Sequence, residues 1–162
     1  MGAFVLQQGY GLSAQLYGLV FAVNALGIVG AGRLSAALVE RVGPRRLLLS
    51  AVTTAMVATL VLLAGVLVSG SVWVVLPPLF VVVACVGLIM PNATALAMAG
   101  QARAAGAASA LIGLLQFSVG AVVPPLASAG GVGPVVMGVA MAATATAAVI
   151  VALLIPRGPR PG

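Results

Sequence analysis

The stretch Asn24–Leu47, NALGIVGAGRLSAALVERVGPRRL, decides the fold of this chain. It begins in an apolar segment, ends in a cluster of charge, and holds four of the seven arginines and the single acidic residue, Glu40. Gly43-Pro44 breaks this cluster, and a second long apolar segment follows directly. The pattern predicts a cytoplasmic hairpin between two membrane-spanning helices, because short arginine-rich loops between apolar runs stay on the cytoplasmic side.

The composition of the whole chain predicts a lipid environment. Of its 162 residues, 63% are hydrophobic and 5% are charged, whereas about 25% of the residues in a soluble domain are charged. The net charge of +6 comes from short arginine clusters between apolar runs. A nucleic-acid surface needs a basic face with reading residues, so we expect no nucleic-acid partner. The single cysteine, Cys85, is expected to pack as a small apolar side chain.

Five long apolar segments predict five transmembrane helices, so the fold class is all-α integral membrane. The expected helices span residues 13–32, 46–68, 72–98, 105–123 and 134–155. Residues 1–12 are expected to form the end of a preceding helix and an extracytoplasmic turn, and residues 156–162 a cytoplasmic tail.

Several residues are expected to mark the helix ends. Ser13 can cap the first helix, which is expected to continue past the membrane to about Glu40. Pro77-Pro78 and Pro91 are expected to interrupt the third helix, and Pro124-Pro125 to end the fourth. The second helix is apolar nearly all round, so we expect it to face lipid.

The distribution of charge among the loops predicts the topology. Arginines follow the first, third and fifth helices, and the loops after the second and fourth helices carry no charge. The positive-inside rule then places the amino terminus outside the cell and the carboxyl terminus in the cytoplasm.

The chain has few side chains that can perform chemistry. It has no histidine, and Glu40 is its only carboxylate side chain. Neither an acid–base pair nor a metal cluster can be built from this set, so we expect no enzyme activity, no metal and no cofactor. No charged residue lies deep in an expected helix, where proton coupling usually needs one.

Polar and soft side chains in the helices are the candidates for a substrate cavity. Asn24 and Gln116 lie near the middle of the first and fourth helices, and Met90, Asn92 and Phe117 are the other candidates. The alternative is that the amides of Asn24 and Gln116 form hydrogen bonds between helices and that the methionine and phenylalanine side chains are simple packing.

Small residues at a spacing of four predict close helix packing. Gly27 and Ala31 form such a pair in the first helix. Ala105, Ser109 and Gly113 form a stripe in the fourth helix.

The hairpin sequence LVERVGPRR, residues 38–46, resembles the cytoplasmic signature loop of the major facilitator superfamily, which reads roughly G-x-L-x-D-R-x-G-x-R-R. Glu40 replaces the aspartate of that pattern, and Ala36 replaces its first glycine. The resemblance implies that Glu40 and Arg41 belong to a charge clasp between helix ends and that Gly43 allows a tight turn. The loop residues are Leu38, Glu40, Arg41, Gly43, Arg45 and Arg46.

Three longer segments resemble the Bcr/CflA (bicyclomycin-resistance) drug:proton antiporters of this superfamily. They are FVLQQGYGLSAQLYGLVFAVNALG, GLIMPNATALAM and GQARAAGAASALIGLLQFSVGAVVPPL. The resemblance implies that the five helices correspond to helices 8–12 of a twelve-helix transporter. The third helix would then line the central cavity, the first and fourth would contact the other half, and the second and fifth would face lipid.

The function implied is that of the carboxyl-terminal part of a multidrug efflux transporter that exports small hydrophobic drugs by proton antiport and is inactive alone. Its implied partners are the lipid bilayer, the missing amino-terminal half, the drugs and protons. The alternatives are a small membrane subunit that pairs with a separately encoded first half and a non-functional remnant. The absence of lysine and the high content of Ala, Gly and Arg are typical of a GC-rich genome, so we expect a bacterial inner membrane.

Overall fold

Five long helices make up most of the part of the chain that the computed structural model describes, residues 6–7, 10–68, 71–99, 105–128 and 133–154. In chain order they are α2 (Ala14–Val42), α3 (Pro44–Val68), α4 (Val72–Met98), α5 (Ala105–Ser128) and α6 (Pro134–Leu154). The side chains of residues 105, 108, 123–124 and 126–128 are not included in the description. The all-α class expected from the sequence is confirmed.

Four of the described helices, α2, α3, α4 and α6, are long and apolar enough to cross a membrane. In α5 the described apolar stretch is shorter and runs over Ser109–Val122. Ser13 caps α2 as expected, because its Oγ accepts a hydrogen bond of 3.3 Å from the backbone N–H of Leu16.

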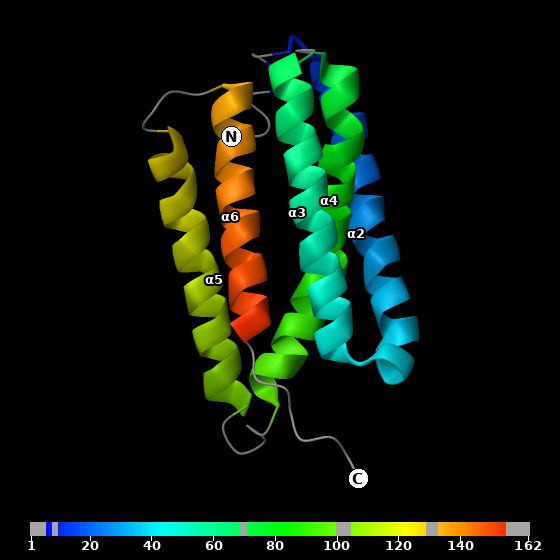
Figure 1. Ribbon diagram of the computed structural model, residues 1–162, viewed down its shortest axis with the longest axis vertical. Helices are drawn as coiled ribbons and strands as arrows, with labels where there is room; N and C mark the ends of the chain where they lie inside the picture. Colours follow the sequence, from blue (N-terminus) through cyan, green and yellow to red (C-terminus); the bar gives the residue numbers. More distant parts are fainter. Residues whose placement is uncertain (1–5, 8–9, 69–70, 100–104, 129–132, 155–162) are drawn as a thin grey trace.

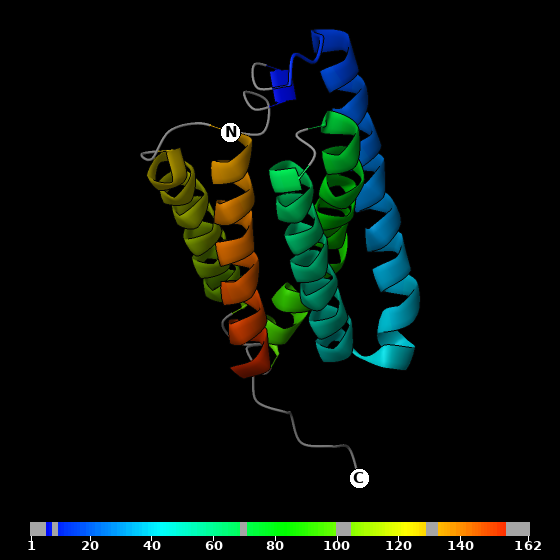
Figure 2. The ribbon, with the colours of Figure 1, turned by 45° about the horizontal axis from the view of Figure 1, so that its top comes forward.

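The helices lie in the spatial order α5, α6, α3, α4, α2 (Figures 1 and 2). The most extensive contacts join α3 to α4 and α6, and α4 to α2, while α5 makes smaller contacts with α4 and α6. The α2–α3 turn and the carboxyl ends of α4 and α6 lie at the same end of the bundle in both views. We call this the charged end, because Arg41, Arg45 and Arg46 belong to that turn.

Helix α3 forms the centre of the described core, so the expectation that it faces lipid can hold only for the part of its surface that stays exposed. It packs between α4 and α6 and leaves only part of its circumference exposed. A helix that is apolar all round suits either lipid or a buried position, and the sequence pattern alone does not distinguish them. The buried residues of α3 are Leu47, Leu48, Ala51, Val52, Ala55, Ala58, Thr59, Leu62, Gly65 and Val66.

Two clusters of buried side chains connect α3 to its neighbours. Near one end, Leu62 and Val66 pack with Val75 of α4 and Met137 of α6, and Tyr10 covers this cluster. Toward the charged end, the second cluster consists of Leu48, Val52 and Ala152. Each cluster joins α3 to α6, and residues of α4 such as Leu79 and Ile89 pack against them, so the three helices share one core.

Proline does not break the helices where the sequence predicted. Helix α4 continues through Pro77, Pro78 and Pro91, and α5 continues past Pro124-Pro125 to Ser128. Within a membrane, neighbouring helices and local adjustments compensate for the missing backbone donors, so the result of a proline is a bend rather than an end. The carboxyl-terminal part of α4 leans toward α5 in Figure 1, and this part contains Pro91.

Candidate functional site

Asn24 lies on α2 and lines two apolar cavities between α2 and α4. The smaller one, of about 240 Å³, is closed partly by Tyr17 and Leu79. The larger one, of about 440 Å³, is lined by residues that include Trp73 and Phe80. The larger volume lies within the range of about 300–1,000 Å³ that is usual for small-molecule sites.

The amide of Asn24 is only partly used by the protein. Its Nδ2 donates a hydrogen bond of 2.9 Å to the carbonyl oxygen of Val20, one turn earlier in the same helix. Its Oδ1 is buried and has no hydrogen-bond partner among the described residues. A buried acceptor without a partner is unfavourable, so a small movement that opened Oδ1 to the cavity would let it accept from one donor group of a bound molecule.

Met90 and Gln116, two other candidates, are brought into contact across the α4–α5 seam. The Gln116 Nε2 lies 3.0 Å from the Met90 Sδ and donates to it. Toward the charged end, the Ser109 Oγ donates to the Met98 Sδ over 3.8 Å. Each contact leaves the thioether partly exposed. Phe117, next to Gln116, is 81% exposed and does not line either cavity at Asn24.

Asn92 is placed differently from the other candidates. Only 1% of it is exposed, and its Nδ2 donates to the Ser35 Oγ of α2 over 2.6 Å and to the carbonyl oxygen of Leu88 over 2.7 Å. Ser35 is also buried. This is an interhelical hydrogen bond of the kind that was the alternative for Asn24 and Gln116, and a role of Asn92 in a cavity stays a prediction.

The contact between α2 and α4 depends on glycines. A Cβ on Gly87 of α4 would clash with the carbonyl oxygen of Ile28 and would lie 2.9 Å from the backbone nitrogen of Gly32. A Cβ on Gly27 would lie 2.6 Å from the ring of Phe80. Gly27 therefore lies at a close helix contact, but the tightest point is at Gly87, which the sequence pattern did not single out.

The other predicted packing residues are less closely packed in the described structure. Ala31 is half-buried on α2. A Cβ on Gly113 of α5 would meet no atom within 4 Å. Ser109 is exposed and donates to Met98, and the side chain of Ala105 lies outside the described residues. A packing role for this α5 stripe stays a prediction.

The signature loop is a one-residue link. α2 ends at Val42 and α3 begins at Pro44, and Gly43 between them has a φ of +85°. The Gly43 N–H donates to the Val39 carbonyl oxygen over 2.9 Å. This backbone conformation is almost restricted to glycine.

The side chains of the loop differ in their exposure. Glu40, Arg41 and Arg46 are exposed, whereas Arg45 and Leu38 are half-buried. Arg103, Arg157 and Arg160 lie outside the described residues. Among the side chains that the structure describes, there is no group of three or more His, Cys, Asp or Glu residues that would suit a metal ion.

The comparisons with known proteins identify the family. A model of the Major Facilitator Superfamily matches residues 1–125. The chain belongs to the major facilitator superfamily. It is also similar to an uncharacterized MFS-type transporter of Bacillus subtilis (strain 168), YdgK, with 34% identity over 142 residues. No solved structure matches the chain.

Membership of the superfamily establishes the general class. The chain is part of a multi-pass membrane transporter, and the superfamily is one of transporters rather than of enzymes. The match covers 88% of this chain but only 35% of the Bacillus transporter, so the chain spans about a third of the length of the curated relative it matches.

Proposed function

We propose that this chain is the carboxyl-terminal part of a drug efflux transporter of the Bcr/CflA type, with α2–α6 in the positions of helices 8–12. The observation that carries the proposal is the pair of cavities at Asn24, because their walls are apolar and their buried amide oxygen has no partner among the described residues. A small hydrophobic molecule with one hydrogen-bond donor suits such a site.

In this proposal, proton coupling depends on groups outside this chain. No Asp, Glu, Lys, Arg or His occurs at positions 14–32, 47–99 or 105–154, which include most of each helix. Proton antiport needs an ionisable group at membrane depth. The complete transporter therefore supplies that group from its other helices, and the chain does not export drugs by itself.

The arginines of the charged end determine the proposed orientation. With these arginines in the cytoplasm, the start of α2 faces the outside of the cell and the carboxyl terminus lies inside. The membrane is proposed to be a bacterial inner membrane, as the composition suggests.

A chimera tests the proposal. The chain replaces the corresponding third of the Bacillus transporter, and pump-deficient bacteria express the chimera, the chain alone, or the chain with the remaining part as a separate protein. We measure the energised export of hydrophobic fluorescent dyes with and without a protonophore. The chimera is expected to export dye in a protonophore-sensitive way, whereas the chain alone is not.

Two variants connect the export to the cavity. In the chimera, Asn24→Leu is expected to raise the KM for dyes that carry a hydrogen-bond donor, because Oδ1 is lost. Val29→Leu, at an exposed position of the same helix, is the matched control. Export by the chain alone, or a chimera that moves only hydrophilic solutes, would contradict the proposal.

A further inference from the structure

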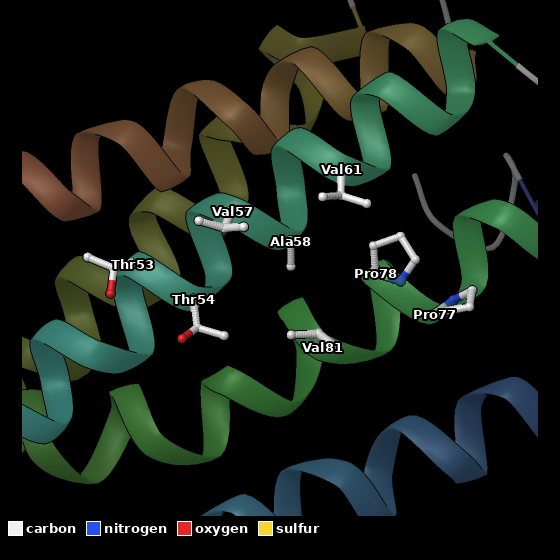
Figure 3. A pocket seen from close by; sticks show the side chains of 8 residues that line it. All are labelled: Thr53, Thr54, Val57, Ala58, Val61, Pro77, Pro78 and Val81. Atoms are coloured by element: carbon white, nitrogen blue, oxygen red, sulfur yellow. The ribbon is translucent and has the colours of Figure 1, made fainter.

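An apolar groove runs between α3 and α4 and adjoins the larger cavity at Asn24, with which it shares Pro77 and Val81. It has a volume of about 530 Å³, and its walls include Thr53, Val57 and Val61 of α3 and Pro78 and Val81 of α4. Figure 3 shows these side chains along the facing sides of the two helices. The α3 residues of the groove lie on the opposite face of the helix from Val52 and Thr59, which line a space shared with α6. The groove therefore opens away from the core.

The walls of the groove are mostly apolar, and the two threonines Thr53 and Thr54 are the polar side chains among its lining residues. The Thr53 Oγ1 lies 2.8 Å from the carbonyl oxygen of Leu49 and 3.0 Å from that of Ser50. Its hydroxyl proton is thus used within its own helix, and its methyl group remains as wall. An extended hydrocarbon chain matches such a surface, whereas a polar molecule does not.

The groove leads along α3 to exposed positive charge. Arg46 lies seven residues before Thr53, so it shares the face of the helix, about 10 Å closer to the charged end. Its side chain is exposed, as is that of Arg41 at the end of α2. Guanidinium groups bind phosphate through paired hydrogen bonds. A positive charge and an apolar groove therefore lie along a single line on the helix.

We propose that this groove binds one acyl chain of an anionic phospholipid whose phosphate is held by Arg46. The groove alone gives no preference among lipids, because hydrocarbon tails are as apolar as the side chains that they would contact. Arg46 supplies the preference, and Arg41 adds to the local positive potential. The site does not depend on the identity of the transported substrate or on which leaflet the charged end occupies.

Photolabelling of the full chain in lipid nanodiscs tests the proposal. The discs consist of phosphatidylcholine with a minority of a photoreactive probe that carries a diazirine on one acyl chain. The probe is either phosphatidylglycerol or phosphatidylcholine. Mass spectrometry then maps the labelled residues. Labelling of Thr53–Val61 is expected to be about fivefold stronger with the phosphatidylglycerol probe, the equivalent of about 1 kcal/mol for one arginine near the surface.

Variants test the contribution of Arg46 and that of the groove separately. Arg46→Gln is expected to reduce the phosphatidylglycerol signal to that of phosphatidylcholine, whereas Arg33→Gln removes another exposed arginine, on α2, and keeps the difference. Val57→Trp fills the groove and is expected to lower labelling at Val81 with both probes.

Three results would overturn the proposal, and the first two need no variant. They are equal labelling of the groove by the two probes in the unaltered chain, labelling of the groove no stronger than that of exposed apolar positions such as Val29, and an undiminished phosphatidylglycerol preference in Arg46→Gln. If protein covers the groove and neither probe labels it, the labelling of the groove is no stronger than that of the exposed positions, and the proposal is overturned.

Discussion

The amide of Asn92 on α4 donates a hydrogen bond of 2.6 Å to the hydroxyl oxygen of Ser35 on α2, and both residues are almost inaccessible. The bond joins residues 57 positions apart in the chain. It lies on the same two helices as the tightest backbone contact, between Gly87 and the Ile28–Gly32 segment. These two features hold α2 against α4.

Removal of this hydrogen bond should weaken the bundle measurably. Interhelical hydrogen bonds in membranes contribute about 0.6 kcal/mol on average and up to about 1.7 kcal/mol. A double-mutant cycle with Asn92→Ala and Ser35→Ala, measured as free energies of unfolding in mixed micelles, should give a coupling energy in that range. Strictly additive effects of the two substitutions would show that the bond contributes nothing.

Gly87→Ala should be strongly destabilising. The added methyl group meets backbone atoms of Ile28 and Gly32, which cannot rotate away as a side chain would. Overpacking of this kind costs about 1–3 kcal/mol. Gly113→Ala is the control, because its Cβ meets no atom within 4 Å and alanine favours a helix by about 1 kcal/mol. Equal unfolding free energies for the two variants would contradict the described helix contact.

Substitution of Gly43 should strain the α2–α3 turn. The φ of +85° at this position costs a non-glycine residue about 1–3 kcal/mol. Gly43→Ala and Gly43→Asp should therefore both destabilise the chain, and Gly43→Asp should also impair transport by the chimera. Gly18→Ala, within α2 and with no atom near its Cβ, should be harmless. Unimpaired transport by Gly43→Asp would argue against the assignment of this loop to the signature motif.

The contact between Met90 and Gln116 can be tested by cross-linking. Cysteines at these two positions, with Cys85→Ser as the background, should be joined by a short bismaleimide, because the two side chains touch. A protease site between residues 99 and 105 shows whether α4 and α5 remain covalently joined after cleavage. A cysteine at the exposed Leu26 of α2, paired with one at Gln116, should give no cross-link. A cross-link between positions 26 and 116 but none between positions 90 and 116 would show that α5 does not pack against α4.

Tyr10 should make stability depend on alkaline pH. Burial against the core cluster raises the pKa of Tyr10 above its usual value near 10, because the charged phenolate is poorly solvated there. The raised pKa contributes stability that is complete below the pKa of the unfolded chain and is lost as the pH rises through the folded pKa. The free energy of unfolding should therefore fall above about pH 10.

Tyr10→Phe should remove this loss and should be neutral or slightly stabilising at pH 7, because the Tyr10 hydroxyl is buried without a partner among the described residues. Tyr17→Phe keeps Tyr10 and should keep the alkaline loss. A Tyr10→Phe variant with the pH profile of the unaltered chain would show that Tyr10 is solvated in the folded protein.

The helices were predictable because length and apolarity are properties of the sequence itself. Long apolar runs separated by Gly43, by residues 69–70 and by residues 100–104 leave little choice about where α3 and α4 begin and end. The family was predictable from the signature loop, since a single turn requires a particular glycine between charged positions. Subfamily, substrate and proton coupling are not confirmed in this way and stay proposals.

The candidate site was less predictable because it depends on which way each helix is turned. Asn24 and Asn92 are both amides in apolar helices, yet one lies at a cavity and the other is buried against Ser35. The importance of Gly87 also depends on the backbone of another helix. The sequence did contain a signal for the hydrogen bond between Ser35 and Asn92. They are two polar residues at similar depths from the charged end of neighbouring helices.

The single-residue link at Gly43 has a mechanical consequence. Adjacent Cα atoms are about 3.8 Å apart, so α2 and α3 cannot separate by more than a few ångströms at the charged end of the bundle. A tilt of α2 must therefore pull on the first turn of α3, and through the contact of α3 with α6 it reaches the far side of the bundle. The connections on both sides of α5 span more residues and impose no such tether. Rocking of the protein during transport would then move α2, α3, α4 and α6 together, whereas α5 would be able to move separately.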